Sequence, residues 1–214
     1  MPAQVSVLFA GIDLAMSPRR PSAFAVLSGC LESFCLYLLR TDSDILAAVD
    51  LHRPLIVAID SPLGLPRGLC CLEEDCSCYP ESEAKGRVCE RELARRGIPC
   101  YYTTKRSIIK EMVYRAMSLK DELCARGYRV IEVYPYASKV QLFGRPIPKK
   151  TTAEGLEVLR EHLIGLIPSL GQHRERLNHD LCDALVAAYT AYLWAEGRAR
   201  PLGVADEFQI CVPG

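Results

Sequence analysis

The sequence lacks the features that would place the protein in a membrane or outside the cell. No basic side chain lies in Met1 to Val5, ahead of the apolar run that follows, which argues against a signal peptide. The longest apolar stretch, Ala184 to Ala195, is too short to span a bilayer and contains Tyr and Thr. We therefore expect a soluble, cytoplasmic protein with no membrane partner.

The sequence also has no net charge, because 26 basic residues balance 26 acidic ones. No global basic field therefore indicates nucleic acid, and only local charge can support such a partner. Half of the 214 residues are apolar, which is enough for a sizeable core. This length suits one large α/β domain, and no linker divides it, so we expect a single domain over residues 1–214.

Asparagine is nearly absent, with Asn178 as the single example, and Arg far outnumbers Lys. This composition is typical of thermophilic proteins, in which intracellular disulfides do occur. The 11 cysteines are odd in number and scattered. Without a signal peptide they do not indicate the disulfide framework of a small secreted protein.

Hydrophobic patterning predicts a β-β-β-α-β-α-β-α order, in which each of the last two helical segments contains two helices. The expected strands are 5–14, 22–27, 32–39, 55–59 and 128–133, with 208–212 as a candidate final edge strand. The expected helices are 42–51, 85–96, 106–126, 151–165 and 179–197. Residues 63–84 look irregular and include a Cys-rich loop at about 66–84.

The connections between these elements decide the fold class. The first two connections are too short for helices, so the first three strands form an antiparallel meander. The apolar run 55–59 is typical of a strand buried on both faces, and such strands pair in parallel. We therefore predict an α/β, RNase H-like fold, with a mixed five-strand sheet flanked by helices.

Acidic residues follow this predicted sheet. Asp13 lies on the first strand and Asp60 ends the fourth, which is its neighbour in this fold. Glu132 lies on the fifth strand, and Asp180 and Asp183 share one face at the start of the last long helix. We predict that Asp13, Asp60, Asp180 and Asp183 are catalytic, and that these four with Glu132 are metal ligands.

Phosphodiester cleavage explains why such acids would gather. Two Mg²⁺ or Mn²⁺ ions about 3.5–4 Å apart activate a water and stabilise the leaving oxygen. These ions prefer oxygen ligands, and clustered carboxylates without a cation would repel one another.

Each acid also has a structural alternative. Asp180 could serve as a partner for the helix dipole, Asp60 as a turn cap and Glu132 as the partner of a buried Arg. Asp13 is harder to explain in this way, because an acid inside an apolar strand has no capping role.

Five motifs resemble a widespread uncharacterised prokaryotic family of predicted nucleases with the RNase H fold. They are GIDLA at 11–15, AIDSPLGLP at 58–66, RVCER at 87–91, EVYP at 132–135 and DLCDAL at 180–185. The same arrangement is similar to that of Holliday-junction resolvases of the RuvC type. In those enzymes acids lie on the first strand, the fourth strand and the last helix, and here Asp13, Asp60, Asp180 and Asp183 match these places. The fourth-strand acid there is usually Glu, and a junction-cutting enzyme of this kind implies a homodimer.

The segment from Lys85 to Arg129 is locally basic, with 12 Lys and Arg against five Asp and Glu. We predict that Arg87, Arg91, Arg95 and Lys105 contact substrate phosphates. Tyr101 and Tyr102 lie between these cations and could stack on bases. The alternative is a solvated helix face with intrahelical ion pairs.

Cys70, Cys71, Cys76 and Cys78, which we call the cysteine cluster, lie in the irregular loop. Their spacing fits no common zinc module, so the sequence slightly favours a disulfide or free thiols over Zn²⁺. In each case we expect a structural role for these four residues.

The sequence favours a two-metal Mg²⁺- or Mn²⁺-dependent nuclease that hydrolyses phosphodiester bonds of DNA or RNA. Two alternatives stay open: a small-molecule phosphotransferase or phosphatase of the actin-like type, and a non-catalytic module that binds nucleic acid.

Overall fold

The computed structural model describes residues 7–17, 19–148 and 152–214 of the chain. The strands are β1 (Leu8–Asp13), β2 (Ser22–Ser28), β3 (Phe34–Leu39), β4 (Ile56–Asp60), β5 (Arg129–Val133), β6 (Ala199–Leu202) and β7 (Ile210–Pro213). The helices are α1 (Asp42–His52), α2 (Val88–Arg95), α3 (Lys110–Ala125), α4 (Pro135–Phe143), α5 (Ala153–Leu166) and α6 (His179–Ala195), with 3-10 helices η1 (Pro168–Arg176) and η2 (Ala205–Glu207).

Some expectations fall on residues that the structure leaves undescribed. The amino-terminal segment Met1 to Val5 lies outside the described residues, as do the first residues of the strand expected at 5–14 and of the helix expected at 151–165. Among the described residues, no helix combines the length and the apolar character needed to cross a membrane.

One mixed sheet runs through the molecule in the order β3-β2-β1-β4-β5-β7-β6. β1 pairs with β2 and β2 with β3 in antiparallel fashion, whereas β4 is parallel to β1 and β5 is parallel to β4. These five strands are the predicted ones in the predicted order, so the RNase H-like α/β fold is confirmed.

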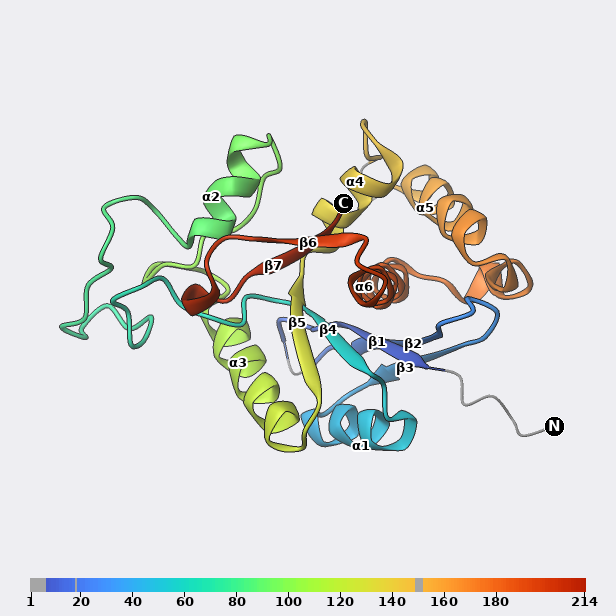
Figure 1. Cartoon of the computed structure of the whole chain (residues 1–214), viewed down its shortest axis with the longest axis horizontal. Helices are drawn as coiled ribbons and strands as arrows, with labels where there is room; N and C mark the ends of the chain where they lie inside the picture. Colours follow the sequence, from blue (N-terminus) through green and yellow to red (C-terminus); the bar gives the residue numbers. More distant parts are fainter. Residues whose placement is uncertain (1–6, 18, 149–151) are drawn as a thin grey trace.

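Helices cover both faces of the sheet (Figure 1). α5 and α6 lie on one face, and α1 and α3 lie on the other. Strand β2 shows why both faces are closed. Ala23 and Leu27 pack in the core beneath α5 and α6, and Phe24 and Val26 pack in the core beneath α1 and α3. The alternation of side chains along a strand therefore supplies both cores.

Helix α6 crosses β1 at Gly11 in very close contact. A Cβ atom at Gly11 would lie 2.1 Å from the backbone oxygen of Ala184 and 2.3 Å from the backbone nitrogen of Ala188. Only glycine therefore permits this approach of backbone to backbone. The contact fixes the position of α6, and hence of its acidic first turns, relative to the end of β1.

Local capping chemistry explains several of the helix ends. Thr41 and Asp44 form a reciprocal capping box at the start of α1. Gly97 and Gly127 follow α2 and α3 with φ values of +69° and +88°, a backbone conformation that favours glycine. Helix α2 begins at Val88 and helix α3 at Lys110, later than the predicted starts at residues 85 and 106.

The structure corrects the expected architecture at two places. The sheet has seven strands, because β6 adds an unpredicted antiparallel edge next to β7. The strand expected as an edge at 208–212 is β7, which lies between β5 and β6. The unpredicted helix α4 begins at Pro135, which also ends the preceding extended segment, as a proline at the first helical position can do.

Candidate functional site

Asp13 and Asp60 are neighbours at the ends of two parallel strands. They are the last residues of β1 and β4, and the register of these strands pairs them directly. Both are half-buried, whereas the four residues before each of them are buried. The predicted meeting of the two acids is therefore present in the backbone, because the carboxyl ends of parallel strands share one edge.

Two further acids come from the start of α6. Asn178 caps this helix, and its side chain accepts a hydrogen bond from the backbone of Leu181. Asp180 lies 3.3 Å from the guanidinium of Arg20, and both side chains keep access to solvent. Asp183 is 4% exposed and accepts a 2.9 Å hydrogen bond from the Lys139 ammonium of α4.

Three cavities open around these four acids. The first has a volume of about 300 Å³ and is lined by Asp13 and Asp60. The second, of about 490 Å³, is lined by Asp60 and Asp183, and the third, of about 200 Å³, by Asp13 and Asp180. Asp60 lines the first and second cavities and Asp13 lines the first and third, so the three cavities are neighbours.

The first cavity has an apolar and aromatic rim beside its acids. Met16, Tyr101 and Ile108 line it and are 61%, 66% and 78% exposed. Tyr134 lines the first and second cavities, and its hydroxyl donates a 2.9 Å hydrogen bond to the backbone oxygen of Pro99. Burial, and then the nearby charge of Asp60, raise the pKa of Tyr134, so its hydroxyl keeps its proton near neutral pH.

Glu132 is held in a buried ionic network that lines part of the first cavity. Both of its carboxylate oxygens accept hydrogen bonds from Arg87, at 2.6 and 2.7 Å, and one also accepts from the backbone of Leu63 at 2.8 Å. Arg87 also donates to Glu90 at 2.9 Å, and Glu90 accepts a hydrogen bond from the backbone of Thr103. The network therefore joins β5, α2 and the loops around them.

This network changes the interpretation of two predicted site residues. Arg87 is 1% exposed, which does not fit the prediction that it contacts a substrate phosphate. Glu132 has the structural alternative expected for it, a buried Arg partner, and that partner is Arg87. Burial raises the pKa of Glu132 and the guanidinium of Arg87 opposes this shift. Both residues line the first cavity, so the role of Glu132 as a metal ligand stays a prediction.

The other predicted phosphate contacts are dispersed. Arg91 donates a hydrogen bond to the backbone oxygen of Gly86, and Lys105 donates one to the backbone oxygen of Cys76. Arg95 is exposed on α2. Two of the predicted phosphate contacts, Arg91 and Lys105, therefore form hydrogen bonds within the protein. Arg95 is the predicted contact that stays exposed to solvent.

The cysteine cluster converges in space. All 11 cysteines of the chain are free thiols in this structure. The four sulfur atoms of the cluster lie within 4.8 Å of one another. Across the part of the chain that the structure describes, this is the one group of three or more Cys, His or acidic ligand atoms close enough to share an ion. The acids on the strands, Asp13, Asp60 and Glu132, do not form such a group.

The donor set of the acids nevertheless fits a hard divalent cation. Mg²⁺ is usually held by one or two protein carboxylates, with water and substrate oxygens as its other ligands. Asp13 and Asp60 supply two carboxylates side by side at an accessible edge, so they fit this mode of binding. A closed cage of protein ligands is not required.

Sequence reasoning did not find two cations beside the acids. Lys139 lies on α4, which was not predicted, and its ion pair with Asp183 joins residues 44 positions apart. Arg20 lies in the connection between β1 and β2 and reaches Asp180 across 160 positions. Spacing along the chain gives no signal for either contact.

Comparison with known proteins agrees with the motifs. A family model described as "Protein of unknown function (DUF429)" matches residues 11–207. The chain belongs to this family. The matched region includes all of the acids and the cysteine cluster. No curated protein shows significant sequence similarity to this member of the family.

Among solved structures, this DUF429 chain is similar to the RuvC structure from Thermus thermophilus. The TM-score is 0.48 and the sequence identity is 18%, over 92% of this chain and 100% of that one. Likeness at this level carries no conclusion about activity. The assignment of the fold depends on the order and pairing of the strands.

Proposed function

We propose that the protein is a divalent-metal-dependent nuclease that hydrolyses phosphodiester bonds. The observation that carries this proposal is the direct pairing of Asp13 with Asp60 at the ends of adjacent parallel strands. Two neighbouring carboxylates at a strand edge supply the oxygen ligands that a hard divalent cation prefers. Their joint exposure to one cavity gives such a cation access to solvent and substrate.

In this proposal, Asp13 and Asp60 hold a first Mg²⁺ or Mn²⁺ ion, and Asp180 and Asp183 provide ligands for a second. Bound divalent ions supply an activated water and a stabilised leaving oxygen. The chain itself positions these ligands. Lys139 holds one oxygen of Asp183, and the close packing at Gly11 places the start of α6 beside β1.

The surroundings of the acids favour single-stranded nucleic acid as the substrate. A net charge of zero and the dispersed cations offer little for non-specific binding of a duplex. The rim formed by Met16, Tyr101 and Ile108 instead offers an apolar and aromatic surface for an unstacked base. Arg20, with 74% of its side chain exposed beside Asp180, is placed to contact the adjoining phosphate.

Cleavage of labelled oligonucleotides in the presence of Mn²⁺ tests the proposal. We expect Asp13→Asn and Asp60→Asn each to lower the rate about 100-fold or more, as for loss of a group that stabilises transition-state charge. Asp121→Asn is a matched control, because Asp121 is an exposed acid on α3. Its rate should equal that of the wild type.

Two other results would contradict the proposal. Hydrolysis of a small phosphomonoester, without cleavage of any oligonucleotide, would instead support a small-molecule phosphatase. Binding of oligonucleotides, without cleavage and without any effect of Mn²⁺, would support a non-catalytic module.

A further inference from the structure

The segment between β4 and α2 is long and irregular, yet it is firmly docked. Residues 61–87 form no helix or strand. Loops longer than about 12–15 residues are uncommon in compact domains unless something functional or structural orders them. Leu72 is fully buried against Ile109 and Val113, and its backbone nitrogen donates a 2.6 Å hydrogen bond to Tyr114. Leu65 and Leu69 pack with Leu72, and Arg67 pairs with Asp206, so several contacts dock the segment.

The cysteine cluster is a further ordering element of this segment. Its sulfurs converge on one point, all within 4.8 Å of one another, and those of Cys70 and Cys76 lie 3.6 Å apart. In a tetrahedral zinc site with Zn–S bonds of about 2.3 Å, two sulfur ligands lie about 3.8 Å apart. Two disulfides would instead group the four sulfurs as two separated pairs, each with an S–S distance of about 2.05 Å.

We propose that Cys70, Cys71, Cys76 and Cys78 bind one Zn²⁺ ion through their four sulfur atoms. Four thiolate ligands without an open position define a structural zinc site, because no ligand position is left for water or substrate. The sequence spacing resembles no common module, and the convergence of an adjacent pair with a Cys-x-Cys pair becomes visible only in three dimensions.

The charges around the cluster suit such a site. Four thiolates around one Zn²⁺ ion carry excess negative charge, which neighbouring cations stabilise. Lys105 donates a hydrogen bond to the backbone oxygen of Cys76. Lys110 pairs with Glu73 at 2.8 Å, and Arg106 lies 3.7 Å from Glu74, so these two cations offset acids of the loop and leave Lys105 as the cation for the thiolates. Part of the basic segment that was predicted to contact substrate phosphates therefore lies against the cysteine cluster.

The zinc site would support one wall of the first cavity. The docked loop packs on Ile109 and Val113 at the start of α3, and Ile108, Ile109 and Met112 from the same region line the cavity beside Asp13 and Asp60. The ion therefore stabilises the loop and this wall and takes no part in the chemistry. The inference is independent of the proposed nuclease activity.

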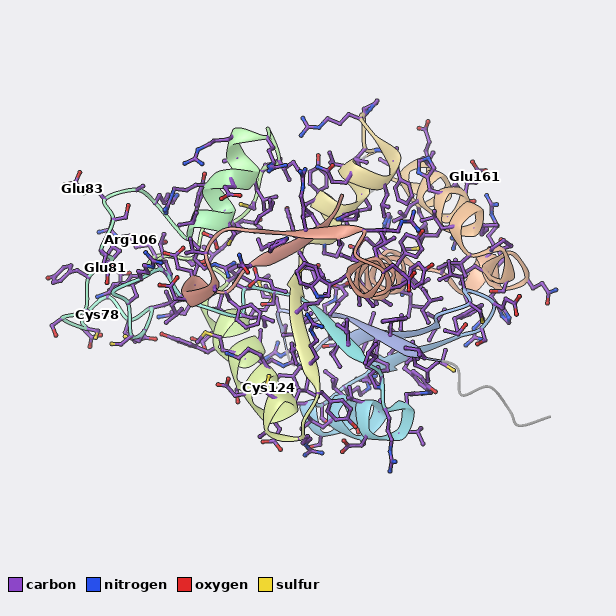
Figure 2. All side chains as sticks on the ribbon, in the orientation of Figure 1. Cys78, Glu81, Glu83, Arg106, Cys124 and Glu161 are labelled. Atoms are coloured by element: carbon purple, nitrogen blue, oxygen red, sulfur yellow. The ribbon has the colours of Figure 1, made fainter. Side chains whose placement is uncertain are left out.

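Metal analysis of the purified full-length chain tests this inference. We expect about one zinc per chain by mass-spectrometric elemental analysis, as for a closed four-ligand site. Replacing the zinc with Co²⁺ should give the visible absorption bands of tetrahedral cobalt bound to thiolates. Figure 2 shows Cys78 at the outer edge of the loop and Cys124 elsewhere on the molecule, so Cys124→Ser is a matched control.

The double variant C76S/C78S should lose the zinc, and the control should retain it. A second measurement uses only the wild type: an organomercurial should release the zinc as it modifies the thiols. A wild-type protein without zinc, whose intact mass shows disulfides among these four residues, would overturn the inference. Full zinc content in C76S/C78S would also overturn it, because the ion would then be bound elsewhere.

Discussion

Replacement of Arg87 by Met removes the centre of the buried ionic network. Arg87 donates two hydrogen bonds to Glu132 and one to Glu90, and the side chains of all three residues are 2% exposed or less. Methionine has a similar length but carries no charge and no donor. The variant therefore leaves two carboxylates buried without their shared cation.

The expected loss of stability follows from this burial. Removing one partner of a buried ion pair costs about 3–5 kcal/mol, because the remaining charge is no longer compensated. This is a large share of the roughly 5–15 kcal/mol by which native proteins are stable. Arg87→Met should therefore lower the free energy of unfolding by about 3–5 kcal/mol.

Urea unfolding followed by far-UV circular dichroism measures this loss. Arg91→Met is a matched control: Arg91 is half-exposed and bonds only a backbone oxygen, so its loss should cost about 1 kcal/mol or less. Adding Glu132→Gln to Arg87→Met should restore part of the stability, because it removes one uncompensated charge. Equal losses for Arg87→Met and Arg91→Met would refute the reasoning.

Arg87→Met should also change how the free energy of unfolding depends on pH. Burial raises the pKa of Glu132 in the folded chain, so the folded state binds more protons than the unfolded state in this range. Stability from this group is therefore complete below the unfolded pKa of about 4.3 and is lost as the pH rises through the folded pKa. Without Arg87 to oppose the shift, the loss of stability as the pH rises above the unfolded pKa of about 4.3 should be larger than in the wild type.

Two further predictions concern the approach of α6 and the rim of the cavity. Gly11→Ala places a Cβ 2.1 Å from the backbone oxygen of Ala184, so urea unfolding should show a loss of about 3 kcal/mol or more, and a loss under about 1 kcal/mol would contradict the close packing. Tyr101→Ala should weaken binding of single-stranded oligonucleotides by about 1–3 kcal/mol in a fluorescence titration, whereas the exposed Tyr79, which lies outside the cavity, should tolerate the same change. Equal affinities for the two tyrosine variants would remove Tyr101 from the proposed substrate surface.

The backbone arrangement could be predicted because it depends on local patterns. Short connections separated the three antiparallel strands, and the uninterrupted apolar run before Asp60 indicated a strand buried on both faces. Once these strands were ordered, the proximity of Asp13 and Asp60 followed. Strand β6 escaped prediction because it has only four residues, and helix α4 because it follows β5 almost directly, with Pro135 as its first residue.

The partners of charged side chains could not be predicted in the same way. Arg87 and Arg91 lie in one short motif, and nothing in the motif shows which of them turns into the core. Lys139 and Asp183 meet only because α4 and α6 pack together after folding. The convergence of the cysteine cluster could not be predicted either. An irregular loop has no periodic pattern that shows which of its residues lie close together.

Binding of Mn²⁺ to the strand acids tests the central proposal most directly. Titration followed by electron paramagnetic resonance of free Mn²⁺ should show a site in the wild type and in Asp121→Asn that is lost in Asp60→Asn. Far-UV circular dichroism and urea unfolding should show that Asp60→Asn stays folded. Unchanged Mn²⁺ binding in Asp60→Asn, or no Mn²⁺ binding in the wild type, would contradict a metal-dependent nuclease site at Asp13 and Asp60.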